Sequence, residues 1–270
     1  MKILSQITPA ETKLIIHSNL VDLKGLMKLT FMDLLLKKVI EIEVVQRKSH
    51  PRDAYTREYT YVVSGKNFDK YSPKKHELVF LSPFLKSPDI QILFKSFIKT
   101  VYDESKGSWN YKKSVRNTSE LKVYFKSTFF HNLFRRIQLT TEGNKLKKEL
   151  TNYLTDLDVD ITNIMNNDKE KALELLQNLK GNIFLLKNLD FELLKKIDTE
   201  LSNQQKKNYS DTSGDYDDDS WLYLFDNEDH RYDSYFDDFN DTIDSFDSDS
   251  SGCSSFDSGC SSCSGCGGCD

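Results

Sequence analysis

Residues 23–45 read LKGLMKLTFMDLLLKKVIEIEVV, and this stretch decides the fold that we expect. Its first part is apolar at steps of three and four residues, which predicts one or two amphipathic helices, with Thr30 capping the second. These apolar positions are Leu23, Leu26, Met27, Phe31, Leu34, Leu35 and Val39. Residues 41–45 then combine glutamate with β-branched residues, and this pattern predicts a strand.

The flanking residues extend this pattern in both directions. Upstream, Thr8 is followed by Pro9 and Glu11, the residues of a capping box, and predicts a helix to about Ser18. Downstream, residues 57–63 predict a second strand, joined to the first by a polar turn. Helices followed by a hairpin are similar to the element order of a winged-helix domain.

Beyond the hairpin, the sequence predicts a short strand at 77–81 and a helix that Ser87-Pro88-Asp89 caps and that continues to Val101. A polar linker is expected at 105–117. A second unit then begins with a helix from Thr118 through Phe129, followed by a short strand at 133–139. A helix from Thr141 and two more between Asp168 and about Asn203, with Asp190 capping the last, complete the predicted body.

Residues 134–146, FRRIQLTTEGNKL, contain the pattern L-T-x-E-G between Leu139 and Gly143. This segment resembles the end of a winged-helix domain, where a wing strand leads into a helix, as in many bacterial transcription regulators. The resemblance covers about 15 residues and implies that the second unit is also winged-helix-like. Ordinary helix capping by Thr140 explains the same residues without a family relationship.

The expected fold is therefore mainly α, of the α+β class, with two winged-helix-like units, small hairpins, extra C-terminal helices and a disordered tail. The expected boundaries are 1–104 for the first unit with an added helix, 105–117 for the linker, 118–204 for the second unit and 205–270 for the tail. The tail is rich in Ser, Asp and Gly and poor in aliphatic residues, a composition typical of disorder.

The formal net charge of −5 hides two segments of opposite charge. Residues 209–270 contain 17 acidic residues and one basic residue, Arg231, for a net charge of −16. Residues 1–208 carry +11, and residues 1–150 alone, with 28 basic and 15 acidic residues, carry +13. A basic body with an acidic tail predicts an anionic partner for the body and an interaction role for the tail.

Basic residues in both units are candidates for a nucleic-acid or anion-binding surface. In the first unit they lie after the long helix and on the hairpin: Lys37, Lys38, Arg47, Lys48, Arg52 and Arg57. In the second unit, which offers more side chains for base contacts, they are Lys122, Lys126, Arg135, Arg136, Lys145, Lys147 and Lys148. The alternative is a solvated lysine-rich face, because attraction to phosphate carries no specificity in itself.

The acidic tail contains apolar residues at helical spacing. These are Tyr232, Tyr235, Phe236, Phe239, Ile243 and Phe246. Aspartates separate them, so a helix here is amphipathic and acidic, and it needs a basic, apolar surface on which to fold. The nearest such surface is the protein's own body, and we expect the tail to dock there and to compete with an anionic ligand. A merely solubilising tail is the alternative.

All five cysteines lie in the last 18 residues, and Cys260, Cys263, Cys266 and Cys269 are spaced as C-x2-C-x2-C-x2-C. Four thiolates at this spacing suit Zn or Cu(I), although neither the usual zinc nor the ferredoxin pattern is matched. A substrate for a modifying enzyme and a featureless low-complexity end are the other interpretations. The tail is similar to the Cys/Gly-rich C-termini of uncharacterised bacterial proteins, a resemblance that implies no activity.

Catalytic motifs are absent: the sequence has no H-E-x-x-H, no G-x-S-x-G and no cysteine in the body. We therefore expect a non-enzymatic protein without a cofactor, and the lack of a long apolar run or signal peptide favours the cytoplasm. The first expectation is an interaction or regulatory protein that binds a protein partner or its own tail, with no small-molecule substrate. A DNA-binding regulator and a metal-handling protein are the alternatives.

Overall fold

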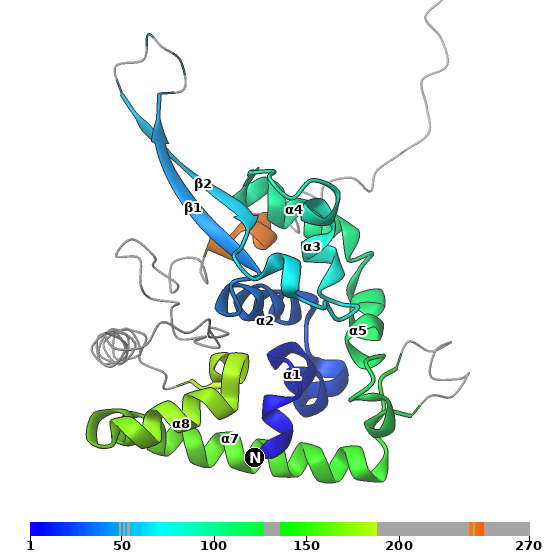
Figure 1. The fold of residues 1–270 in the computed structure, drawn as a ribbon. Helices are drawn as coiled ribbons and strands as arrows, with labels where there is room; N and C mark the ends of the chain where they lie inside the picture. The colour runs from blue at the N-terminus through cyan, green and yellow to red at the C-terminus, as the bar shows by residue number, and fades with distance from the viewer. Residues whose placement is uncertain are drawn as a thin grey trace, which may run out of the picture.

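The computed structural model of the chain describes residues 1–48, 50, 52, 55–126, 136–187, 238–239 and 241–245. The fold is mainly helical with one small antiparallel sheet, as predicted for the α+β class (Figure 1). The helices are α1 (Pro9–His17), α2 (Leu23–Leu36), α3 (Leu78–Lys86), α4 (Phe94–Glu104), α5 (Ser108–Arg116), α7 (Thr141–Asn167) and α8 (Lys169–Leu179). The strands, in sheet order, are β1 (Ile40–Arg47), β2 (Arg57–Ser64) and β3 (Ile92–Leu93).

Helix α1 begins as its sequence predicts. The Thr8 hydroxyl accepts a hydrogen bond from the Glu11 amide, and the Glu11 carboxylate accepts one from the Thr8 amide at 2.7 Å. Pro9 occupies the first helical position, where a missing amide hydrogen costs nothing. The apolar residues of α1, Leu14 and Ile15, are fully buried.

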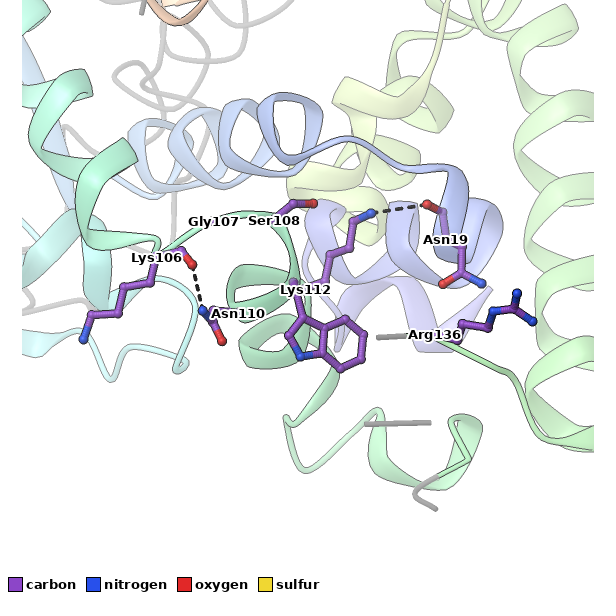
Figure 2. Close-up of a pocket in the computed structure, with 8 residues that line it drawn as sticks. Asn19, Lys106, Gly107, Ser108, Asn110, Lys112 and Arg136 are labelled. Atoms are coloured by element: carbon purple, nitrogen blue, oxygen red, sulfur yellow. Dashed lines mark hydrogen bonds between the residues drawn. The ribbon is translucent and has the colours of Figure 1, made fainter. Parts of the chain in front are cut away.

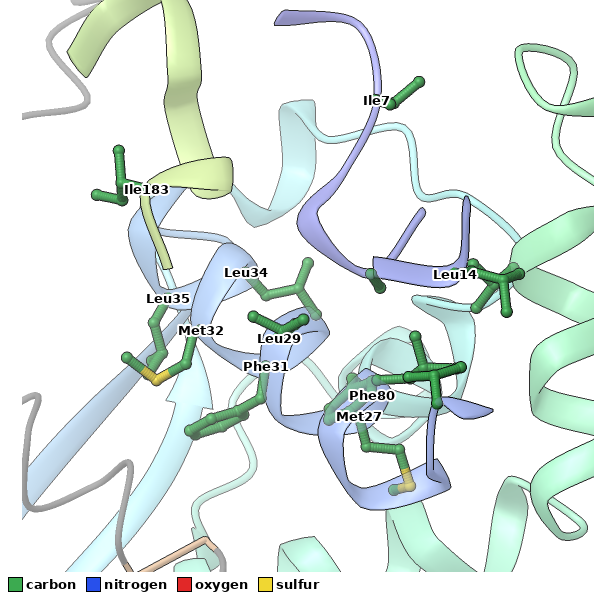
Figure 3. Packing of buried hydrophobic residues seen from close by; sticks show 14 of the residues in the cluster. Ile7, Leu14, Met27, Leu29, Phe31, Met32, Leu34, Leu35, Phe80 and Ile183 are labelled. Atoms are coloured by element: carbon green, nitrogen blue, oxygen red, sulfur yellow. The ribbon is translucent and has the colours of Figure 1, made fainter. Parts of the chain in front are cut away.

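Helix α2 is a single continuous helix, whereas the sequence pattern was compatible with either one or two helices. Asp22 caps it by accepting from the Gly25 amide, and Thr30, expected to be a cap, lies in its interior and donates to the Leu26 carbonyl. The apolar side chains of α2 point from different sides of the helix (Figure 3). A helix that is buried all round lies at the centre of a core, so the other elements pack around α2.

The predicted hairpin is confirmed. Strands β1 and β2 pair from Ile40 opposite Ser64 to Arg47 opposite Arg57, and β3 pairs with β2. Only the base of the hairpin is anchored: Ile40, Ile42 and Val62 are buried, while the outer ends of both strands are exposed. The hairpin therefore projects away from the helices (Figure 1).

Two predictions between residues 77 and 101 were wrong. Residues 77–81, expected to be a strand, begin α3, because Phe80, Leu81 and Phe84 are buried on one helix face. The following helix starts at Phe94 rather than near Ile90, since Ile92 and Leu93 pair with β2 instead. In both cases, packing against α2 or the hairpin overrides local preference.

The linker predicted at 105–117 contains helix α5. Tyr111 and Val115 of this helix are buried, and the Tyr111 hydroxyl donates to the Thr30 hydroxyl of α2 at 2.9 Å. One hydrophobic cluster contains described residues of both predicted units, from Leu4 to Ile161 and beyond. The helix escaped prediction because three apolar residues, Trp109, Tyr111 and Val115, among polar ones give a weak periodic signal.

The second unit agrees with the prediction at α7 and differs before it. Thr140 caps α7 by accepting from the Gly143 amide at 3.1 Å, but the expected preceding helix is a 3-10 turn, Lys122–Tyr124. Phe125 and Leu139 then form an isolated antiparallel bridge, while residues 127–135 lie outside the described part. Asp168 caps α8, a 3-10 helix follows at Lys180–Leu185, and the restart predicted at Asp190 is also outside it.

Candidate functional site: a tail segment docked on helix α2

An aromatic cluster surrounds Phe31 on α2. The ring centroid of Phe31 lies 5.8 Å from that of Phe94, 6.2 Å from Phe97 and 6.3 Å from Phe80. These partners come from α3 and α4, and Phe31 itself has no exposed surface. The cluster thus holds three helices together with rings at distances typical of favourable aromatic pairs.

A short part of the acidic tail completes this cluster. Residues 238–239 and 241–245, here called the docked segment, are helical and lie near the base of the hairpin (orange in Figure 1). Phe239 and Ile243 are both fully buried, and the Phe239 ring centroid lies 5.4 Å from that of Phe31. Residues four apart share one helix face, so the segment buries one face. Burying each of these side chains contributes about 1.5–3 kcal/mol.

One ion pair lies at the edge of the docked segment. The Lys24 ammonium, in the first turn of α2, is 2.5 Å from the Asp244 carboxylate. The Asp244 side chain is 62% exposed and that of Lys24 is 24% exposed. A pair this exposed contributes about 0–1 kcal/mol, so it orients the segment more than it stabilises it.

The remaining residues of the predicted docking and metal sites lie outside the described part of the chain. They are Tyr232, Tyr235, Phe236, Phe246, Cys260, Cys263, Cys266 and Cys269. Within the described residues, no group of three or more His, Cys, Asp or Glu side chains is arranged to hold a metal ion. Of the two predicted sites, the structure therefore describes Phe239 and Ile243.

The basic residues predicted in the second unit come from several short elements and α7. Lys122 belongs to the 3-10 turn, Lys126 follows the bridge residue Phe125, and Arg136 precedes the bridge residue Leu139. Lys145 and Lys148 of α7 are exposed, Lys147 is half-buried, and Arg135 lies outside the described residues. The start of α7 packs against the Lys122–Tyr124 turn, so these cations belong to neighbouring elements.

Arg136 also lines a hollow that sequence analysis missed (Figure 2). Its volume is about 790 Å³, and its lining contains three cations and no acidic residue: Asn19, Lys106, Gly107, Ser108, Trp109, Asn110, Lys112 and Arg136. The Lys112 ammonium donates to the Asn19 carbonyl at 3.3 Å, and the Asn19 side chain pairs with both backbone groups of Ile137. Most of the lining lies in the segment predicted to be a linker, so no sequence signal singled it out.

A polar network of mostly buried side chains joins the end of α2 to the start of α3. The Lys37 ammonium lies 2.7 Å from Asp33 and 3.7 Å from Glu77, and Tyr71 donates to Glu77 at 2.8 Å. Burial lowers the pKa of Lys37, but Asp33, Tyr71 and Glu77 outweigh burial and hold this pKa above its usual value. Lys37 was a candidate for the basic surface, and its neutralising partners remove it from that surface.

His76 and Lys74 connect this region to the cap of α1. The Lys74 ammonium lies 2.7 Å from the Glu11 carboxylate, and the fully buried His76 lies 3.4 Å from the Thr8 hydroxyl. Burial, followed by the charges of Lys74 and Lys37, lowers the pKa of His76 to about 3. Burial and the cationic neighbours thus keep the imidazole of His76 neutral at neutral pH.

The outer hairpin presents cations on an exposed surface. The Arg47 guanidinium stacks over Tyr59 and Tyr61, at 4.9 and 5.4 Å from the ring centroids, and it donates to the Tyr61 hydroxyl. Arg47 is also directly opposite Arg57 in the strand register. Like charges at opposite positions of a sheet repel each other, so the end of the hairpin attracts anions.

Comparison with family models, curated proteins and solved structures finds no match for this chain. The winged-helix resemblance of the Leu139–Gly143 pattern therefore remains a prediction. In addition, none of the helices in the described ranges combines the length and apolarity needed to cross a membrane. The assignment of function rests on the geometry of the chain itself.

Proposed function

We propose that this chain is a non-enzymatic interaction protein that regulates itself, with its acidic tail covering an apolar site on its own body. The burial of Phe239 and Ile243 beside Phe31 carries this proposal. A solubilising tail has no need of fully buried aromatic and aliphatic side chains. The occupied site consists of the aromatic cluster and the rim residue Lys24.

The distribution of charge supports self-regulation. The tail from residue 209 onward carries −16 and the body +11, so the two parts attract each other over a longer range than the apolar contacts. An anionic partner of the body must compete with the acidic tail of the same molecule. Docking therefore lowers the apparent affinity for such a partner by the fraction of molecules whose site is open.

Hydrogen exchange of the full-length chain tests the docking. We expect the amides of residues 238–245 to be protected in the wild type and to lose protection in Phe239→Asp, while the amides of α2 stay protected in both. Asp241→Asn is the matched control, since Asp241 is an exposed residue of the same segment. Equal, unprotected exchange of the segment in wild type and Phe239→Asp contradicts the proposal.

A DNA-binding function is a second candidate, because the hairpin places Arg47 opposite Arg57 on a projecting, exposed arm. Anisotropy of a labelled 20-base-pair duplex of random sequence, titrated with salt, tests it on the full chain. Contacts by these arginines predict that Arg47→Ala/Arg57→Ala reduces the slope of log affinity against log salt by about 2.

The matched control for this experiment is Lys145→Ala/Lys148→Ala, which removes the same charge from exposed positions on α7. If only the α7 variant weakens binding, the contact lies on the second unit, as the sequence pattern predicts. If the wild type shows no salt-dependent affinity, the protein is not a DNA-binding protein.

A further inference from the structure

The docked segment shows which chemical pattern its site selects. The two fully buried residues of the segment are an aromatic side chain, Phe239, and an aliphatic one four positions later, Ile243. The residue that follows, Asp244, reaches the rim cation Lys24, while Asp241 points to solvent. The site thus accepts one face of a helix, with an aromatic residue, an aliphatic residue one turn later and an adjacent acid.

We infer that this site also binds, in place of the tail, a short acidic amphipathic helix of a partner protein with this same pattern. The inference rests on the proposed function, because the site must open for a partner to enter. An apolar groove that receives one helix face recognises its ligand through anchors at helical spacing. Any segment that presents the same anchors makes the same contacts with Phe31 and Lys24.

The positive charge around the site favours an acidic helix over a basic one. Lys24 stands at the edge of the site on a body whose net charge is +11, so a basic helix with the same apolar anchors meets repulsion. The aromatic position is specified by ring contact, since Phe239 lies nearer to Phe31 than Phe80, Phe94 or Phe97 does. A smaller side chain at this position leaves a void against the ring of Phe31.

Binding of a synthetic peptide to full-length protein tests the inference. The probe is a fluorescent peptide with the sequence of residues 232–247, YDSYFDDFNDTIDSFD. We expect it to bind the Phe239→Asp chain at least tenfold more tightly than the wild type, because the wild-type site is occupied in cis. Ile243→Asp is the second variant. Circular dichroism checks that each variant is folded, and if one has a folding defect the other still gives the answer.

Specificity is tested with altered peptides. A peptide that carries alanine in place of Phe239 and Ile243 should lose at least tenfold in affinity, whereas a scrambled peptide with the same composition should not bind measurably. A peptide with Asp244→Lys should bind weakly to the Phe239→Asp chain and recover affinity when that chain also carries Lys24→Asp. Such recovery depends on the pairing of these two charges and does not arise from a general change in stability.

The outcomes separate this inference from the proposed function. The amides at 238–245 can be protected in the wild type while the peptide binds neither the Phe239→Asp nor the Ile243→Asp chain. This result leaves the docking intact and overturns the partner inference. Equal binding of the scrambled peptide also overturns it, since charge alone then explains the affinity. If these two variants dimerise through the same site, its ligand is a second copy of this chain, and the partner inference is overturned as well.

Discussion

The rings of Phe31 and Phe239 lie 5.4 Å apart between centroids, and both side chains are fully buried. One belongs to the central helix α2 and the other to the docked segment of the acidic tail. This contact makes the tail segment part of the hydrophobic core. The docked segment therefore influences both the stability of the protein and the access of other molecules to α2.

The first prediction concerns the unequal effect of truncating these two rings. Replacing a core phenylalanine by alanine costs about 3–5 kcal/mol, and we expect this for Phe31→Ala. Phe239→Ala should lower the free energy of unfolding by only about 1–3 kcal/mol, because the segment can leave its site while the rest stays folded. Urea denaturation measures both values. Equal losses for the two variants would show that the segment cannot open separately.

The second prediction concerns the pair Lys24 and Asp244, whose charged atoms are 2.5 Å apart at a partly exposed position. A double-mutant cycle of Lys24→Ala and Asp244→Ala should give a coupling energy of about 0.2–1 kcal/mol at low salt. Because water and ions screen exposed charges, the coupling should decrease toward zero at about 1 M salt. A coupling that is independent of salt contradicts an electrostatic contact.

The third prediction concerns Gly143 in the L-T-x-E-G pattern. A Cβ atom at this position would lie 2.2 Å from the Tyr124 carbonyl oxygen, a backbone atom that cannot turn aside. Gly143→Ala should therefore destabilise the protein by about 1–3 kcal/mol, although alanine favours helices.

Gly25→Ala is the matched control for this prediction. The nearest atom to its new Cβ belongs to the Asp22 side chain, which unlike a backbone atom can shift by a bond rotation, at most with loss of its capping hydrogen bond to the Gly25 amide. We expect a smaller change in the midpoint of thermal unfolding for this variant. If both glycine variants are equally stable, the close approach of α7 to Tyr124 does not exist in solution.

The fourth prediction concerns pH. His76 has a pKa of about 3 in the folded chain, below the ordinary value of 6.5, because burial and the charges of Lys74 and Lys37 oppose protonation. As pH falls, His76 takes up its proton in the unfolded chain before it does so in the folded chain. The contribution of the neutral His76 to the free energy of unfolding is therefore fully present above pH 6.5 and is lost as pH falls toward 3. The slope from this group is at most about 1.4 kcal/mol per pH unit.

The His76→Gln variant measures this contribution. It retains a polar group near Thr8 without a titrating imidazole, so its free energy of unfolding should fall less between pH 6.5 and 4 than that of the wild type. Urea titrations at several pH values give this difference. Parallel pH profiles for the two chains would mean that His76 is protonated in the folded protein or exposed to water.

Local sequence patterns predict the elements whose signals are complete within a few residues. The capping box of Thr8 and Glu11, the strand pair expected at 41–45 and 57–63, and the cap of α7 at Thr140 are all found, with β1 extending to Arg47. Prediction fails where tertiary contacts decide. The stretch at 77–81 is helical because Phe80 and Phe84 pack into the aromatic cluster, and α5 forms because Tyr111 reaches Thr30.

The sequence by itself determines the opposite charges of body and tail and the helical spacing of Phe239 and Ile243, since both are properties of residue order. Only the tertiary structure decides which surface this spacing meets. That surface is assembled from α2, α3 and α4, whose aromatic residues come together only when the chain folds. The same holds for Lys37, which looks like a surface cation in the sequence but is half-buried and paired with the buried carboxylates of Asp33 and Glu77.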